Sequence, residues 1–235
     1  MKEFVVCVFL TVATCTSGHG QVLISLLLGD KLNSDNVEFG LDGGVSFVTQ
    51  RGVDGDVWTT FNLGFYFNFS LDDAWFLHTG VIVKSPMGEA GIQPYSIGDP
   101  QLDDLLIDSE VTRKLGYFHV PVLLQRRFKE RYFVEAGPQL GLRHSATDLF
   151  ETKTETGDDL QFDHDISDDV KVLDAGVVLG AGYRFRAGKS MSLGCRWYAG
   201  LLNVFKDGKG YNNSVTIFAS IPIGAGNAKN QNINQ

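Results

Sequence analysis

The feature that most constrains this sequence is a set of eight segments in which apolar and polar residues alternate with a period of two. In residues 61–71, Phe61 and Phe65 share one face, whereas Asn62 and Asn68 share the other. A β-strand places successive side chains on opposite faces, so this period predicts strands. The remaining segments are residues 37–47, 75–84, 117–125, 132–143, 173–185, 192–201 and 214–221. Most are about 9 to 13 residues long, the length of a tilted strand that crosses a bilayer.

The connections between these segments alternate in length. The short ones span residues 71–74, 128–131 and 186–189, and the longer ones lie near residues 50–57, 85–112, 144–171 and 203–212. Outer-membrane barrels have short periplasmic turns and longer extracellular loops. The pattern therefore predicts an all-β fold, an eight-stranded antiparallel transmembrane β-barrel in the outer membrane of a Gram-negative cell.

A soluble β-sandwich or lipocalin-like barrel is the alternative fold, because its strands also alternate apolar and polar residues. The mean hydropathy of −0.02 does not separate the two, since membrane strands average lipid-facing and lumen-facing residues. Here the apolar faces are long and aromatic, and the opposite faces carry glycines and charges of both signs. A narrow lumen filled by side chains explains that polar face, so the membrane barrel is favoured.

The first 20 residues predict an export signal. Lys2 precedes an apolar stretch, and Gly18 and Gly20 place small residues at positions −3 and −1 before Gln21. This order is typical of a secretory signal that is cleaved before Gln21. The alternative is lipoprotein processing at Cys15. The expected segments are a signal peptide at residues 1–20, a barrel domain at residues 21–226 and a polar C-terminal tail at residues 227–235.

Several classes of function are disfavoured by composition and motifs. The net charge of −8 argues against a nucleic-acid partner, because phosphates attract basic surfaces. Beyond the signal, Cys195 is the only cysteine, so no internal disulfide is expected. No Gly-x-Ser-x-Gly motif occurs, and nothing fixes a catalytic triad. We therefore expect no enzyme, no cofactor and no metal centre. His78 and His119 could ligate a metal but are better explained as lumen hydrogen-bonding groups.

Charged residues fall on the inward phase of several predicted strands, Lys84 among them. Unpaired charges in a narrow interior are costly, so they should pair with one another. The expected network crowds three arginines together with acids and closes the lumen to ions. Its members are Glu38, Asp42, Glu135, Arg143, Asp174, Arg184 and Arg196.

The second and third long connections are strongly acidic. Residues 85–111 contain six acids and no Lys or Arg, and residues 144–171 contain nine acids against two lysines. One hypothesis is weak divalent-cation binding at Asp163, Asp165, Asp168 and Asp169. The alternative, a solvated extracellular surface, is favoured because the spacing of an EF-hand loop is absent.

Four stretches resemble the PorT-like outer-membrane β-barrel family. They are Tyr-Phe-His-Val-Pro-Val-Leu-Leu at 117–124, Val-Glu-Ala-Gly-Pro-Gln-Leu-Gly-Leu at 134–142, Asp-Ala-Gly-Val-Val-Leu-Gly-Ala-Gly-Tyr at 174–183 and Arg-Trp-Tyr-Ala-Gly-Leu-Leu-Asn at 196–203. The resemblance implies contact with outer-membrane lipid and, for some members, a link to protein secretion through other envelope proteins. It implies no catalytic residue.

Two functions remain open from the sequence. The first is a non-enzymatic barrel with a structural or accessory role, whose lumen is plugged by the paired charges. The second is a small transport barrel that passes an ion or a solute. They differ in how the lumen is packed.

Overall fold

The computed structural model describes residues 36–153, 159–186 and 190–223. These residues form nine strands and one short helix. In chain order the elements are β1 (Val37–Arg51), β2 (Trp58–Ser70), β3 (Trp75–Ile92), α4 (Pro100–Leu106), β4 (Glu110–Phe128), β5 (Tyr132–Lys153), β6 (Asp159–Asp165), β7 (Leu173–Arg184), β8 (Ser192–Gly200) and β9 (Tyr211–Pro222).

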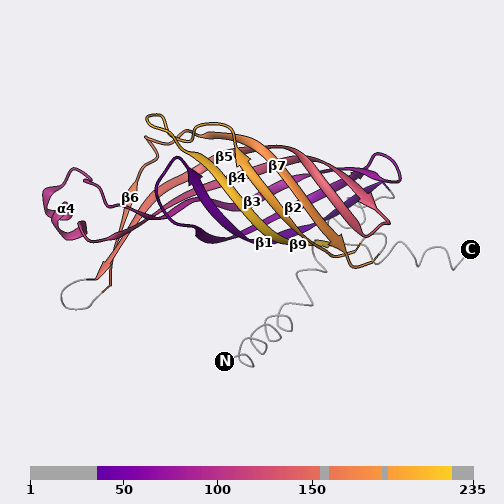
Figure 1. The fold of residues 1–235 in the computed structure, drawn as a ribbon, viewed down its shortest axis with the longest axis horizontal. Helices are drawn as coiled ribbons and strands as arrows, with labels where there is room; N and C mark the ends of the chain where they lie inside the picture. Colours follow the sequence, from indigo (N-terminus) through magenta and orange to yellow (C-terminus); the bar gives the residue numbers. More distant parts are fainter. Residues whose placement is uncertain (1–35, 154–158, 187–189, 224–235) are drawn as a thin grey trace, which may run out of the picture.

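Eight of the strands close into a ring. The sheet runs from β4 through β3, β2, β1, β9, β8 and β7 to β5, and the pairing of β4 with β5 completes the circle. Neighbouring strands are antiparallel throughout. This confirms the predicted eight-stranded barrel, which Figure 1 shows from the side. Closure removes the free edges that a bilayer does not tolerate.

The alternating pattern sets which residues face outward. Along β2, Phe61, Leu63 and Phe65 are exposed at 47%, 41% and 36%, whereas Tyr66 and Asn68 are buried at 2% and 5%. The other ring strands show the same alternation of exposed apolar and buried polar side chains. The apolar side chains therefore form an outer band suited to lipid, and the polar ones fill the lumen.

The predicted phase is wrong at the far end of β3. The register with both neighbouring strands shifts between Ile82 and Ser85, so one extra residue is accommodated there. A β-bulge of this kind reverses the face of every residue beyond it. Lys84 consequently lies on the exposed outer surface, with its Nζ 6.0 Å from the centre of the Phe61 ring, and Ser85 is buried instead.

The two acidic connections are more ordered than predicted. β3, β4 and β5 continue beyond the length that a bilayer requires, and β6 pairs with the end of β5 outside the ring. With α4, these strand ends form a projection at one end of the barrel, on the left in Figure 1. We call it the extracellular extension. It has its own apolar cluster of buried Leu106, Val111 and Phe150, which holds the paired strands together outside the membrane.

The predicted signal peptide at residues 1–20 and the tail at residues 227–235 lie outside the described residues. The boundaries of these segments and the cleavage before Gln21 therefore stay predictions. Among the described residues, no helix has the length and apolarity needed to cross a membrane.

Candidate functional site

Arg196 is the centre of the polar lumen. Its Nε donates a hydrogen bond to Glu135 Oε1 at 2.5 Å, and its Nη1 donates to Asp42 Oδ2 at 2.8 Å. The guanidinium carbon also lies 3.9 Å from the centre of the Phe218 ring. The side chain of Arg196 is only 11% exposed, and that of Glu135 is fully buried. One cation thus bridges strands β8, β5 and β1 across the interior.

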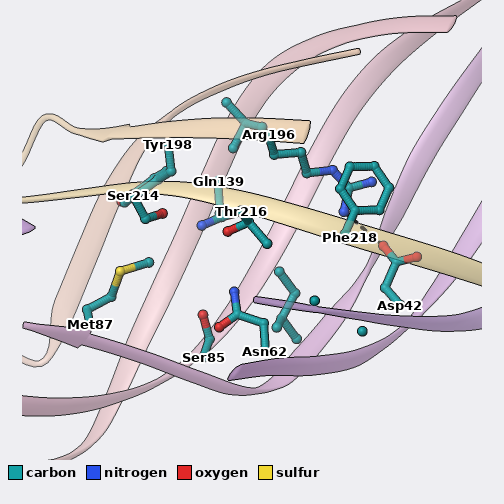
Figure 2. A pocket seen from close by; sticks show the side chains of 14 residues that line it. Asp42, Asn62, Ser85, Met87, Gln139, Arg196, Tyr198, Ser214, Thr216 and Phe218 are labelled. Carbon is teal, nitrogen blue, oxygen red and sulfur yellow. Dashed lines mark hydrogen bonds and ion pairs between the residues drawn. The ribbon is translucent and has the colours of Figure 1, made fainter. Parts of the chain in front are cut away.

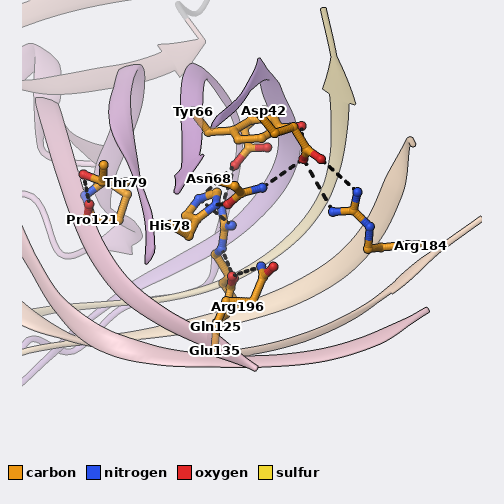
Figure 3. A network of polar contacts seen from close by, with 11 residues as sticks. Asp42, Tyr66, Asn68, His78, Thr79, Pro121, Gln125, Glu135, Arg184 and Arg196 are labelled. Atoms are coloured by element: carbon orange, nitrogen blue, oxygen red, sulfur yellow. Dashed lines mark hydrogen bonds and ion pairs between the residues drawn. The ribbon is translucent and has the colours of Figure 1, made fainter. Parts of the chain in front are cut away.

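A chain of hydrogen bonds links this centre to a second ion pair, as Figure 3 shows. Arg196 Nη2 lies 3.0 Å from His78 Nε2, and His78 Nδ1 lies 2.7 Å from Asn68 Oδ1. A guanidinium can only donate, so His78 Nε2 accepts and its Nδ1 carries the hydrogen. Asn68 Nδ2 then donates to Glu38 Oε1 at 2.9 Å, and Arg184 Nη2 donates to Glu38 Oε2 at 2.9 Å.

A glycine makes room for the central pair. A Cβ at Gly180 would lie 2.9 Å from Glu135 Cγ and 3.1 Å from Arg196 Cγ. Gly180 faces both residues in the register of β7 with β5 and β8. The glycine-rich inward face of β7 therefore has a packing role, because it lets long charged side chains from the neighbouring strands meet.

The structure does not bring all the predicted network residues together. Arg143 lies apart from Arg184 and Arg196, and its Nη2 donates to the carbonyl oxygens of Ser167 and Val170 at 3.0 and 3.2 Å. The expected crowding of three arginines is therefore wrong. Along β5, Arg143 lies eight residues beyond Glu135, toward the extracellular end, and its side chain there reaches the chain that follows β6.

Asp174 belongs to a separate polar group nearer the extracellular end. Its Oδ2 accepts hydrogen bonds from Tyr198 Oη at 3.0 Å and from Asn212 Nδ2 at 2.9 Å. His119 Nε2 lies 3.9 Å from the same oxygen. No arginine or lysine side chain among the described residues lies within 4.0 Å of the Asp174 carboxylate. Neutral donors therefore hold this buried acid in place of the arginines that were expected.

A small cavity lies between the two polar groups. Its volume is about 40 Å³, which accommodates about three water molecules. Figure 2 shows Asp42 on one side of it, with Asn62 and Ser85 from β2 and β3 on another. Asp42 Oδ1 and Asn62 Oδ1 are buried without a hydrogen-bond partner within the described part of the chain. Both are acceptors, so ordered water is the natural partner for them.

A cluster of apolar residues lies toward the extracellular end of the barrel. The chain after β6 and the chain after β8 contribute buried Ile166, Val170 and Val204, which pack in one cluster with lumen-facing Leu123 and Val178. Backbone bonds join the two connections, among them Lys171 N to Val204 O at 2.7 Å and Lys206 N to Asp169 O at 2.9 Å. We call this cluster the mouth seal.

An ion pair joins β4 and β5 within the extracellular extension. Arg113 donates from Nε and Nη2 to the two oxygens of Asp148 at 2.8 and 2.6 Å, and Tyr95 Oη donates to Asp148 Oδ2 at 2.7 Å. Burial, together with the Asp148 carboxylate, raises the pKa of the Tyr95 hydroxyl, which therefore stays protonated and remains a donor. The guanidinium of Arg113 also lies over the Phe205 ring at 4.9 Å, beside the mouth seal.

No metal site is assembled in residues 36–153, 159–186 and 190–223, where no three His, Cys, Asp or Glu side chains are arranged to hold an ion. This includes the four aspartates considered for a divalent cation. Asp165 Oδ1 instead accepts a hydrogen bond from Ser167 N at 2.8 Å. His78 and His119 each have the hydrogen-bonding role preferred from the sequence, because His119 Nδ1 lies 2.8 Å from Ser85 Oγ.

Of the residues that connect the ion pairs, sequence reasoning identified His78 as a lumen hydrogen-bonding group but did not single out Tyr66, Asn68 and Gln125. These three lie on the inward phase of their strands, so the period-two pattern could have identified them as candidates. Nothing in the pattern pointed to the mouth seal, whose key residues lie in irregular connections. Their burial depends on how two separate loops meet.

The closed ring, outer apolar band and charged interior define an outer-membrane β-barrel protein. A family model described as an outer membrane protein beta-barrel domain matches residues 31–206, so the chain belongs to that family. This assignment is broader than the PorT-like family, and membership of the latter stays a prediction.

Solved structures with similar folds include three bacterial barrels. Ail of Yersinia pestis shares 10% identity over 80% of this chain and 98% of its own, with a TM-score of 0.41. Neisserial surface protein A shares 8% identity over 79% and 96%, with a TM-score of 0.40. The outer membrane protein AlkL shares 17% identity over 81% and 92%, with a TM-score of 0.41. No curated protein matches the sequence. The family assignment rests on the family model alone.

Proposed function

We propose that this protein is a closed, non-enzymatic barrel that anchors the extracellular extension in the outer membrane and presents it to a partner protein. The observation that supports the proposal is that two layers of side chains fill the lumen. The Arg196 centre spans the interior at one level, and the mouth seal covers it at another. A barrel whose lumen is filled by side chains at two levels is suited to presenting an extracellular structure and not to conducting ions or solutes.

The extension is the part suited to binding. It stands beyond the membrane band, has its own apolar cluster, and the Arg113–Asp148 pair joins its strands β4 and β5. Its exposed side chains include many carboxylates, so a partner with a basic surface fits best. The resemblance to PorT-like proteins favours an envelope protein of a secretion system as that partner.

The small polar cavity is the observation that favours transport instead. A solute on such a path would have to displace the Arg196 pairs and then the mouth seal. A cavity of about 40 Å³ is far smaller than ligand pockets of about 300–1,000 Å³. Only water or a single small ion fits without rearrangement, so the anchoring function is preferred.

Replacing Phe150 by alanine should loosen the extension and leave the barrel folded. Phe150 is fully buried in the outer apolar cluster, and losing its burial should cost about 1.5–3 kcal/mol locally. Limited proteolysis of intact cells should therefore cut the extension faster, because cleavage follows the population of the open form. The heat-dependent gel mobility of the barrel should not change.

The same variant tests the proposed function. Crosslinking on whole cells should capture a partner with the wild type and lose it with Phe150→Ala. The lipid-facing variant Phe47→Ala is the matched control, because Phe47 is 40% exposed on the outer band, and it should keep the partner. An identical crosslinking pattern for the wild type and Phe150→Ala would contradict the proposal, as would solute uptake by liposomes that contain the wild type.

A further inference from the structure

Aromatic and basic side chains form a continuous belt across four neighbouring strands at the short-turn end of the barrel. We call it the aromatic–arginine belt, and its residues are Trp75, Arg126, Phe128, Arg131, Tyr132 and Tyr183. The strand register makes the belt continuous. Trp75 faces Arg126 across β3 and β4, Phe128 faces Tyr132 across β4 and β5, and Tyr132 faces Tyr183 across β5 and β7.

The two arginines of the belt are held by aromatic rings. The guanidinium of Arg126 lies 5.2 Å from the centre of the Trp75 ring and 5.3 Å from that of Phe128. Arg131 Nη1 donates to Tyr183 Oη at 3.0 Å. Stacking on a ring uses the face of a guanidinium and leaves its in-plane N–H donors available for an anion. The aromatic residues therefore position two cations: Arg126 keeps its in-plane donors for an anion, and Arg131 keeps those that Tyr183 does not use.

No carboxylate in the described part of the chain neutralises the positive charge of the belt. Within the described residues, no carboxylate lies within 4.0 Å of either guanidinium. Lys129 and Arg186, in the adjacent turns, add two exposed cations, and Glu130 is the one acid in the described part of these two turns. The turn between β2 and β3 also contains an acid, Asp72. Its carboxylate is occupied within the turn, because Oδ1 accepts hydrogen bonds from the backbone nitrogens of Ala74 and Trp75.

The belt lies where the exposed apolar rows of the barrel end and the tight turns begin. Directly above it on the same outward rows are exposed apolar residues, Leu124 at 44% and Val134 at 47%. Below it are the tight turns, where Lys129 and Glu130 have φ values of 49° and 57° and the chain reverses. Aromatic side chains are enriched where the hydrocarbon ends and the headgroups begin. Exposed Tyr132 at 57% and Phe128 at 42% fit this position.

We propose that the aromatic–arginine belt is a binding site for an anionic phospholipid of the periplasmic leaflet. The phosphate is bound by Arg126 and Arg131, the rings of Phe128 and Tyr132 contact the glycerol region, and the acyl chains follow the apolar rows above. A guanidinium matches a phosphate group through paired N–H donors. The nearby Lys129 and Arg186 favour a lipid with net negative charge over a zwitterionic one.

Native mass spectrometry of the purified barrel tests this site. The protein is titrated with phosphatidylglycerol and, separately, with phosphatidylcholine of the same chain length. The wild type should retain phosphatidylglycerol preferentially. Each of Arg126→Gln and Arg131→Gln should weaken that retention about fivefold, since a basic residue near an anionic surface contributes about 1 kcal/mol. The double variant should bind the two lipids nearly equally.

Lys84→Gln is the matched control. Lys84 is an exposed cation near an aromatic ring on the outer face, but it lies outside the belt. Removing it should leave the preference unchanged, and unchanged heat-dependent mobility should show that all variants are folded. Equal retention of both lipids by the wild type, a preference that survives in the double variant, or an equal loss in Lys84→Gln would overturn the site. Displacement of the lipid by millimolar inorganic phosphate would overturn the phospholipid as its occupant.

Discussion

Replacing Arg196 by methionine is expected to destabilise the folded barrel by about 3–5 kcal/mol. The substitution replaces the aliphatic part of the side chain with one of similar length but removes the charge between Asp42 and Glu135. Both carboxylates then stay inside a narrow lumen without their cation, and Glu135 is fully buried. The cost comes mainly from this uncompensated charge, because a buried pair itself contributes little net stability. Urea unfolding of the refolded barrel in lipid vesicles measures it.

A compensated variant separates charge from packing. If Asp42→Asn and Glu135→Gln are added to Arg196→Met, no unpaired charge remains in this group, and most of the lost stability should return. A loss of less than about 1 kcal/mol for Arg196→Met alone would mean that the group behaves like an exposed pair, against the buried lumen described here.

Replacing Phe65 by arginine is expected to lower the free energy of unfolding by about 2–4 kcal/mol, the second large effect. Phe65 lies in the middle of β2 and points outward, opposite Leu41 on β1 and Val81 on β3. An arginine there would place a charge in the hydrocarbon region of the bilayer. The same unfolding titration in vesicles measures the loss.

Phe65→Leu is the control, because it keeps an apolar side chain on the lipid face and should cost far less. The neighbouring inward variant Asn68→Ala should also be destabilising, since Asn68 joins His78 to Glu38. The cause of this destabilisation differs from that of Phe65→Arg, because Asn68→Ala breaks buried hydrogen bonds and places no charge in lipid. If Phe65→Arg were tolerated as well as Phe65→Leu, the outward face assigned to β2 would be wrong.

The sequence predicted the barrel because the period of two is a direct consequence of strand geometry. Every ring strand was anticipated, and inward Glu38, Asp42 and Glu135 were placed on the correct face. The pattern failed where geometry is not periodic. A bulge in β3 turned Lys84 outward, and Arg143, which lies farther along the barrel than Glu135, bonds to backbone carbonyls of the irregular chain after β6.

The alternating pattern could not predict which charged residues form ion pairs with each other. Glu38 and Arg184 are 146 positions apart in the sequence, and they meet only because closure of the ring brings β1 and β7 to the same level. The extracellular extension was likewise predicted as loops. Its strands are stabilised by a second apolar cluster around Phe150, which depends on how α4 packs on them.

Single-channel recording in a planar bilayer tests the closed lumen most directly. Purified wild-type protein is reconstituted at neutral pH, and insertion is verified in the same preparation by its heat-dependent gel mobility. The Arg196 pairs and the mouth seal predict no steady conductance from inserted barrels. A stable, ion-selective conductance from the wild type would contradict the closed lumen and establish the barrel as a channel.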